Sequence, residues 1–558
     1  MSSSTSSPAP APGLLAELYL GRVRWDAVRP FPVHDPADRA VGDKVVTELT
    51  ALLREHVDPE AVDRGGRLPD GLTDRLREGG FLSLTMGPEL GGLDLSPMNS
   101  LRLVEAAASW STPVAWMLAI SNGFGSGAYL PLLSDGPLRD MIAEKVAAGT
   151  LSGSADTEVG GAANEGRATT AVPVEDGAAY VITGEKVFIG NAPIAGLVDV
   201  SAMVRADDGK QVRIFFVPTD FPGVHVVSAQ EFLGLRGASV GVLRFDGVRV
   251  PAEYLLPAEE ASWRDEPALV RLAIMARMLV IASPSLAIAK LCLGWQRDFV
   301  NRRAMDGRTL GDFDEVQRLV ARSAADVFAM ESLVEWTMLD EDLDAKVPEC
   351  TAAKNLTSLA CWRVVDNTLS LLAGEGFETA ASKARRGAAP LPVERAFRDA
   401  RGLRVAGGVD FLLDYWSGLA NVKVTGDDGP VPAVSDAALS GRCADHLRAL
   451  QVETVRLGEL RTRLLDEHGS QLPEREHELI LLSRIANGLL SMTVTLARAA
   501  HLAEQGDSGA LDLADVACVD ERDRLAAAWA ELDADWPDYA ELSKRLLSGV
   551  SVLEGDRG

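Results

Sequence analysis

The chain has little positive charge for its size. Its 558 residues include 55 Lys and Arg against 81 Asp and Glu, which gives a formal net charge of −26 at pH 7. This surplus of negative charge repels polyphosphates, so we expect no nucleic acid partner. Hydrophobic residues make up 47% of the chain. Disordered, collagen-like and disulfide-scaffold classes are therefore excluded, and we expect several domains with real cores.

Cysteines, targeting signals and metal-binding patterns are also scarce. The five cysteines are scattered without a CxxC pair, which predicts reduced thiols in a cytoplasmic protein. The N-terminal MSSSTSSPAPAPG has neither the basic nor the apolar region of a secretory signal. The most apolar stretch, Leu272–Trp295, is interrupted by Arg277 and Lys290, so we expect no membrane span. No HExxH, no GxxxxGK(S/T) and no Cys/His cluster at zinc spacing occurs, so we expect no metal.

What the chain does contain is a change in the spacing of its apolar residues along its length. Apolar residues recur at helical spacing before residue 150 and again from about 266, whereas 168–250 holds short β-branched runs separated by turn signals. This order predicts an α+β fold. The predicted units are a flexible tail (1–30), an N-terminal helical domain (31–150), a middle β domain (151–262), a C-terminal helical bundle (263–425), a linker (426–436) and an additional C-terminal helical domain (437–558).

A set of short motifs, in order along the chain, is more specific than any one of them. They are Pro88-Glu-Leu-Gly-Gly-Leu, Thr157-Glu158-Val-Gly160-Gly, Gly184-Glu-Lys186-Val-Phe188-Ile-Gly190-Asn191-Ala, Gly234-Leu-Arg236-Gly, Phe245-Asp-Gly-Val-Arg249-Val-Pro251, Arg303-Ala-Met-Asp-Gly307 with Gln317, Ala373-Gly374-Glu-Gly376-Phe377 and Pro392-Val-Glu394-Arg-Ala-Phe-Arg398-Asp399-Ala-Arg401. From about residue 43 the chain resembles the acyl-CoA dehydrogenase superfamily. Residues 437–549 resemble the extra helical domain of its very-long-chain branch.

The resemblance implies a fold, a cofactor and a reaction. The fold would hold FAD between the β domain and the helical bundle, in a dimer or tetramer. The usual reaction is α,β-dehydrogenation of an acyl thioester, carried by CoA or by an acyl-carrier protein. In that reaction a carboxylate removes the α-proton, and proton transfer of this kind contributes roughly 10²–10⁴-fold in rate. The electrons then pass to an electron-transfer flavoprotein.

The resemblance also assigns cofactor contacts, and several of them depart from the family pattern. Thr157 matches the residue at the flavin edge, Phe188 the aromatic beside the ring, and Gly190 a position that usually carries a hydroxyl near N5. Arg303 and Gln317 would reach the FAD of a neighbouring subunit, and the glycine loop of Gly374 and Gly376 would face its adenylate half. Further departures at the expected cofactor contacts are Ala163, Asp306, Val409 and Phe411.

The catalytic base is the largest departure. Counting from Arg398, the glutamate of the family falls on Gly407, and the alternative position on the first helix of the bundle falls on Val270. Neither residue accepts a proton. Asp410 and Glu375 are candidates for a relocated base, although Asp410 is also typical of a helix start and Glu375 of a surface ion pair. Arg398-Asp399 is more typical of a structural ion pair than of chemistry.

Several functions are compatible with these residues. The first is an acyl-CoA dehydrogenase-like flavin oxidoreductase with a non-standard mechanism, and a relocated base would restore ordinary dehydrogenation. A second is a base-less partner subunit that completes the flavin site of a homologous chain. The others are flavin monooxygenase chemistry and a flavin-free homologue with non-redox chemistry, since a fold alone does not fix a function.

Overall fold

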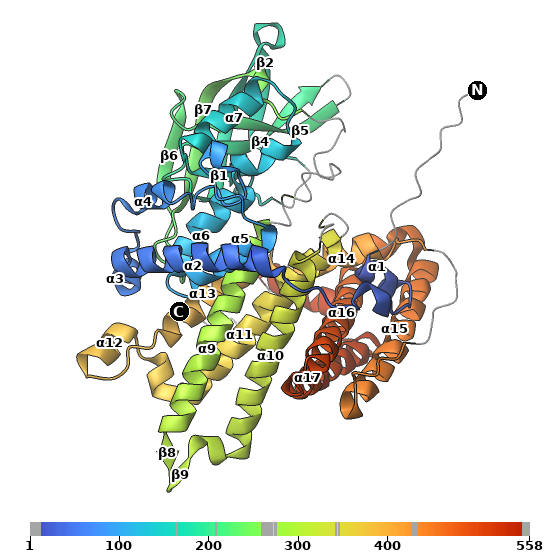
Figure 1. Ribbon diagram of the computed structural model, residues 1–558. Coiled ribbons are helices and arrows are strands. Elements are labelled where there is room, and N and C mark those ends of the chain that lie inside the picture. The colour runs from blue at the N-terminus through green and yellow to red at the C-terminus, as the bar shows by residue number, and fades with distance from the viewer. Residues whose placement is uncertain are drawn as a thin grey trace.

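We describe a computed structural model of the chain, in which four successive units follow one another (Figure 1). The described residues are 13–162, 166–206, 209–257, 272, 276–340, 343, 346–426 and 434–549. Helical, β and helical units appear in the order that the sequence predicts, and the α+β fold class is confirmed. Most of the predicted linker, residues 427–433, lies outside the described residues.

The N-terminal unit is a layer of helices between the sheet and the long bundle (Figure 1). Its longest helix, α2, begins after Asp35, whose carboxylate accepts hydrogen bonds from the N–H groups of Ala37 and Asp38. The helix α6 continues directly into a short π-helical segment, η3. The helices are α2 (Pro36–His56), α3 (Pro59–Gly65), α4 (Leu72–Glu78), α5 (Pro97–Ala108), α6 (Thr112–Ala119), η3 (Ile120–Phe124) and α7 (Pro137–Ala147).

The β unit is one sheet of seven strands. The order is β1-β4-β2-β3-β7-β6, with β5 on the free side of β4; β1 and β2 run parallel to β4, and the other pairs are antiparallel. Alternating β-branched and aromatic residues such as Val198, Phe215 and Phe245 form its core. The strands are β1 (Ser152–Ala155), β2 (Thr170–Val174), β3 (Ala179–Gly190), β4 (Leu197–Ala206), β5 (Gly209–Pro218), β6 (Val224–Ala229) and β7 (Val240–Pro251).

The bundle that follows is built on three long helices. Figure 1 shows α9, α10 and α11 side by side, extending from the helical layer to the small β8–β9 hairpin at the far end. The elements are η7 (Met278–Ala282, a π-helical segment), α9 (Ser283–Arg302), β8 (Ala304–Met305), β9 (Arg308–Thr309), α10 (Asp314–Met338), α11 (Val347–Phe377), α12 (Ala380–Arg385), α13 (Val393–Val405) and α14 (Asp410–Asn421).

The additional C-terminal helices surround α16, which is buried along most of its length. The stretches Met278–Arg302 and Glu476–Glu504 are long and apolar enough to cross a membrane, but 72% and 89% of their most apolar windows are buried against other elements. Burial in the core therefore accounts for their composition. The helices are α15 (Gly441–His468), α16 (Glu476–Glu504), α17 (Gly509–Leu532) and α18 (Tyr539–Leu547).

The expectation of a flexible tail over 1–30 does not hold for residues 13–30. They include the helix α1 (Leu14–Tyr19), which packs on α15 and α16 at the opposite end of the chain (Figure 1). Leu15 and Leu18 are fully buried there, and the N–H of Leu15 donates to Oε1 of the buried Glu349 at 2.8 Å. Burial of several leucines outweighs the cost of ordering this segment. Residues 1–12 lie outside the described part.

Candidate functional site

Two motifs of the β unit are held together by a buried ion pair. Lys186 in β3 is fully buried, and its ammonium lies 2.9 Å from Oε1 of Glu158 in the loop after β1. The Glu158 carboxylate also accepts the backbone N–H groups of Ala168 and Thr169. Burial opposes its charge, but the hydrogen bonds from Lys186 and these N–H groups prevail and lower the pKa of Glu158 to about 2. The loop that carries Thr157 is therefore fixed in position.

This loop borders an exposed group of apolar side chains, which we call the apolar platform: Val159, Phe188, Phe232 and Leu233. Three segments supply it. The N–H of Val187 donates to the Thr157 carbonyl at 2.9 Å, and the N–H of Phe188 donates to the side chain of Gln230 at 2.8 Å. The Phe188 ring is 58% exposed, and its centroid lies 6.4 Å from that of Phe232. An exposed apolar surface beside polar groups is typical of a ligand site.

Gly190 lies where the structure leaves little room for a side chain. A Cβ on Gly190 would lie 3.1 Å from the Ile120 side chain in η3, and one on Gly123 of η3 would lie 2.8 Å from the Cα of Ala276. The two glycines therefore allow β3, η3 and the start of η7 to stack closely. This stacking connects the platform strand to Arg277, the next residue after Ala276. Short π-helical segments such as η3 and η7 occur frequently at functional sites.

The predicted base position is a turn between α13 and α14. Gly407 and Gly408 have φ values of +68° and +98°, which favour glycine. Nε of Arg277 lies 3.3 Å from the Gly407 carbonyl oxygen, and the Lys354 ammonium donates to the Gly408 carbonyl at 2.7 Å. Two cations thus contact the turn to which the resemblance assigns the catalytic carboxylate. The alternative base position, Val270, lies outside the described residues.

The carboxylates nearest this turn are each hydrogen-bonded to an arginine. Oδ2 of Asp410 accepts hydrogen bonds from Arg404 on α13, and Oδ2 of Asp414 accepts one from Nε of Arg484 at 3.1 Å. Burial raises the pKa of Asp410, but the Arg404 hydrogen bonds outweigh it, so the net pKa lies below the usual range. A carboxylate held in this way is a weak base, so Asp410 fits the role of a structural residue at the start of α14.

Glu375 is far from the turn. It follows a break in α11 at Ala373, whose φ is +47°, and the rise of the helix from Lys354 to Leu372 alone covers about 27 Å. Its Oε2 lies 2.6 Å from Nη2 of Arg302 at the far end of the bundle. The structure therefore does not bring Glu375 to the predicted base position within one chain.

The predicted cofactor contacts form two groups, one at each end of the long helices of the bundle. Thr157, Phe188 and Gly190 lie beside the platform, whereas the other predicted residues lie near the β8–β9 hairpin (Figure 1). There, Arg303 and Gln317 are exposed, and Nε2 of Gln317 donates to the Gly311 carbonyl. The four at the far end are Arg303, Gln317, Gly374 and Gly376. Of the remaining departures, Ala163 lies outside the described residues, and Phe411 is exposed at the start of α14.

Arg398 and Asp399 connect the β unit to the bundle. Arg398 binds Asp63 through both Nη atoms at 3.0 and 2.8 Å, and it also binds Glu394. Oδ1 of Asp399 accepts the N–H of Leu235 at 2.5 Å. Burial raises the pKa of Asp399 to about 6. These contacts fix the loop after the platform against α13, and we call them the α13 latch. The structural interpretation of this pair therefore fits its contacts.

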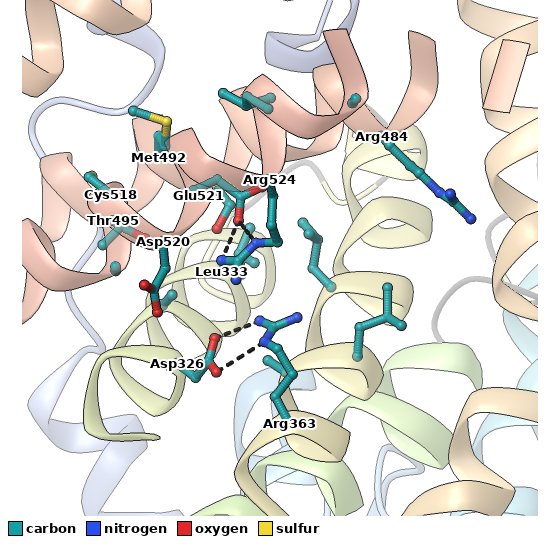
Figure 2. A pocket seen from close by; sticks show the side chains of 18 of the residues that line it. Asp326, Leu333, Arg363, Arg484, Met492, Thr495, Cys518, Asp520, Glu521 and Arg524 are labelled. Atoms are coloured by element: carbon teal, nitrogen blue, oxygen red, sulfur yellow. Dashed lines mark hydrogen bonds and ion pairs between the residues drawn. The ribbon is translucent and has the colours of Figure 1, made fainter. Parts of the chain in front are cut away.

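A cavity of about 280 Å³ lies elsewhere, between α10, α11, α16 and α17. Figure 2 shows Arg363 directed at Asp326, and Arg524 at Glu521, with Met492 and Thr495 on the helix above. None of the predicted site residues lines this cavity. Among the residues that the structure describes, no group of His, Cys, Asp or Glu is arranged to hold a metal ion.

Sequence reasoning missed Arg277 and Lys354 as parts of the site. In the sequence, Arg277 is only a charge that interrupts an apolar stretch. Lys354 stands among Ala, Asn and Leu on a helix whose apolar residues do not mark a single face, so spacing does not show what it contacts. A buried lysine within a long apolar helix is the signal that could have identified it, because such a residue requires a partner.

Comparisons with known proteins cover most of the chain. The models for the N-terminal, middle and C-terminal domains of acyl-CoA dehydrogenase match residues 43–150, 153–248 and 270–411. The probable acyl-CoA dehydrogenase FadE10 of Mycobacterium tuberculosis is 30% identical over 407 residues, 72% of this chain. The match spans only 62% of that relative's length. The human very long-chain specific acyl-CoA dehydrogenase, mitochondrial, is 23% identical over 96% of this chain and 87% of its own length.

Solved structures show the same fold. An acyl-CoA dehydrogenase from Bacillus anthracis, complexed with FAD, has a TM-score of 0.75 at 18% identity and covers 97% of this chain and 96% of its own. Butyryl-CoA dehydrogenase from Megasphaera elsdenii has a TM-score of 0.61 at 20% identity, over 70% of this chain and all of its own. The first of these likenesses extends over the additional C-terminal helices.

Proposed function

The chain belongs to the acyl-CoA dehydrogenase family, and we propose that it is a flavin oxidoreductase that acts on an acyl thioester with FAD as its cofactor. The observation that carries this proposal is the close stacking of β3, η3 and η7. This stacking connects the apolar platform, through Arg277, to the Gly407 turn. A flavin ring could then lie on the platform, with the substrate between the ring and the turn. The non-standard feature is the missing base at Gly407.

The residues beside the platform fit a flavin ring. Phe188 is held with φ at +60° and presents its ring to solvent, so it offers a face for stacking. The Thr157 hydroxyl has no hydrogen-bond partner among the described residues, which leaves it available to a ligand. Gly190 provides close packing against Ile120, so the absence of a hydroxyl there has a structural reason. FAD, when bound, would supply the hydride-accepting ring.

The chain's own residues would bind and orient the reactants. We propose that Thr157 and Phe188 position the ring, and that the Gly407 turn borders the reacting carbons of the thioester. Arg303, Gln317 and the Gly374–Gly376 loop lie too far away to reach the same cofactor. They would therefore serve a second copy of the chain, which supports a dimer or a larger assembly with paired sites.

A second candidate function follows from the separation of the predicted cofactor contacts into two groups. A chain without a base still presents Arg303 and Gln317 at an exposed end of the bundle. It could therefore complete the flavin site of a homologous chain that does carry the glutamate. In that case the chain would bind a cofactor but would not turn over substrate alone.

Restoring the base tests the proposed function. We expect FAD-loaded protein to be bleached slowly by acyl-CoA thioesters under anaerobic conditions, and Gly407→Glu to be bleached about 10²-fold faster. The positive φ at Gly407 makes any side chain cost about 1–2 kcal/mol. Gly407→Gln is therefore the control, because it carries the same strain without a proton acceptor. Stopped-flow absorbance of the flavin band is the measurement.

Three outcomes would contradict parts of this account. If Gly407→Glu is no faster than Gly407→Gln, the missing base is not what limits the reaction. If Asp410→Asn abolishes bleaching of the wild-type protein, Asp410 is the base despite its bond to Arg404. Bleaching only after a glutamate-bearing homologue is mixed in would replace the first function by the second.

A further inference from the structure

Cations outnumber carboxylates around the Gly407–Gly408 turn. The side chains near it are Arg277, Lys354, Arg404, Arg484, Asp410 and Asp414. The two aspartates are paired with Arg404 and Arg484. Arg277 and Lys354 have no carboxylate partner among the described residues. Each of these two cations instead contacts a backbone carbonyl of the turn.

The pairing capacity of both cations is mostly unused. A guanidinium has several N–H donors in a planar fork, and that of Arg277 makes one contact, at 3.3 Å. Lys354 is fully buried, and beyond the Gly408 carbonyl its ammonium has only Oδ1 of Asn355, at 3.5 Å. Asp410 and Asp414 attract the Lys354 ammonium, whereas Arg277 and Arg404 repel it, and burial opposes its charge. A further anion beside these cations would therefore be stabilised.

The turn also leaves space beside Arg277. A Cβ on Gly407 would have only two described neighbours within 4 Å, Cγ of Arg277 at 3.7 Å and Cγ1 of Ile281 at 3.8 Å. Both are at ordinary contact distance. An added atom can therefore lie there, against the aliphatic part of Arg277. A planar carboxylate matches the guanidinium of Arg277 because it can accept two parallel N–H bonds.

We propose that the space beside Gly407, bounded by Arg277 and Lys354, binds a carboxylate of the substrate. The substrate class is then a thioester of a short dicarboxylic acid, whose free carboxylate occupies the place that a side-chain carboxylate has in other members of the family. This assignment rests on the proposed function. A free small carboxylate such as acetate has the same chemistry and would occupy the same space.

Calorimetric titration of the FAD-loaded protein tests the substrate class. Succinyl-CoA and butyryl-CoA have equal chain lengths and differ in one carboxylate. We expect succinyl-CoA to bind at least about tenfold more tightly to the wild-type protein. Arg277→Gln should bring the two Kd values within about twofold, whereas Arg277→Lys should keep part of the difference. The matched control is Arg524→Gln, which removes an arginine at the cavity of Figure 2 and should leave the ratio unchanged.

A second variant protects the test against a folding defect at Arg277. Gly407→Ala leaves Arg277 in place and puts a methyl group into the space, so it should also reduce the preference for succinyl-CoA. Circular dichroism and thermal unfolding would show whether each variant is folded. Equal Kd values for the two thioesters in the wild-type protein would overturn the proposal. So would a preference that survives both Arg277→Gln and Gly407→Ala.

An acetate titration separates this proposal from the function on which it rests. We expect about 100 mM sodium acetate to raise the Tm of the wild-type protein by roughly 1–2 °C over sodium chloride at equal ionic strength, and not that of Arg277→Gln. If neither thioester binds but acetate stabilises through Arg277, the anion site stands and the thioester function fails. If neither thioester binds and acetate has no specific effect, both fail.

Discussion

At the scale of single residues, the effect of Gly407 comes from its neighbours. In a neutral environment the loss of a glutamate would remove a proton acceptor and nothing else. Here Arg277 and Lys354 lie beside the turn, so the absence of a glutamate leaves an excess of positive charge that Asp410 and Asp414 offset only in part. Burial, together with the charge of Arg277, lowers the pKa of Lys354 to about 8. Under the proposed function, the position that the resemblance assigns to the base therefore carries an excess of positive charge.

Asp199 gives a prediction about stability at the same scale. It is buried in β4, where Oδ2 accepts a 2.7 Å hydrogen bond from Ser154 and Oδ1 has no partner. Burial raises the pKa of Asp199 to about 7. The folded state then holds a proton that the unfolded state releases near pH 4. The free energy of unfolding of the protein therefore falls as the pH rises from about 4 to about 7.

Replacing Asp199 by Asn should remove that loss. We expect Asp199→Asn to be more stable than the wild-type protein at pH 8, by an amount on the order of 1 kcal/mol, and the difference to shrink towards pH 5. Thermal unfolding over this pH range is the measurement, with the exposed Asp220→Asn as control. A difference that does not change with pH would show that the carboxylate is not protonated in the fold.

At the scale of elements, the site depends on how β3, η3, η7 and α13 are held together. The α13 latch is one of the polar connections in this arrangement. It connects α3, α13 and the loop after the platform through Arg398, Asp63 and Leu235. Both Arg398 and Asp63 are mostly buried, so each needs the other.

Breaking the latch should loosen the cofactor site as well as the fold. We expect Arg398→Met to lower the free energy of unfolding by about 2 kcal/mol, because it leaves Asp63 largely buried without its partner. FAD should also dissociate more readily. Arg318→Met, at an exposed pair with Glu315, should cost less than about 0.5 kcal/mol.

Urea unfolding and FAD retention on gel filtration would measure the two effects. A double-mutant cycle with Asp63→Asn should show a coupling energy of at least about 1 kcal/mol. Additive losses would mean that the two residues act independently, and the latch would then not be the connection described.

Sequence reasoning reached the element order and the motifs but not the contacts between them. Helical and alternating periodicities identified the helices and strands, because both depend on local spacing. Gly190 and Gly407 were recognised as departures from the family pattern. That Gly190 packs on Ile120, and that Gly407 lies beside Arg277, depends on residues more than 60 positions away. Spacing within one element does not carry that information.

At the scale of the whole molecule, the two ends of the chain form one core. Leu14, Leu15 and Leu18 of α1 lie in the same apolar cluster as the buried residues of α15, α16 and α17. The sequence did not predict this, because a short helix after a Ser- and Pro-rich start has no long periodic pattern. The additional domain is thus completed by the N-terminal segment.

The distribution of the predicted cofactor contacts over the whole molecule supports the proposed assembly of more than one chain. Thr157 and Phe188 lie at one end of the long helices, and Arg303 and Gln317 lie at the other (Figure 1). A single cofactor can contact both groups only if they come from different copies. FAD binding and assembly are therefore expected to depend on each other.

The most direct test of the account is the absorption spectrum of the purified protein, combined with mass analysis of any ligand released on denaturation. We predict the bands of a bound flavin, with FAD as the released molecule in an amount close to one per chain. A protein that is colourless as purified and stays colourless after FAD is added would contradict the central claim that the platform beside Thr157 and Phe188 is a flavin site.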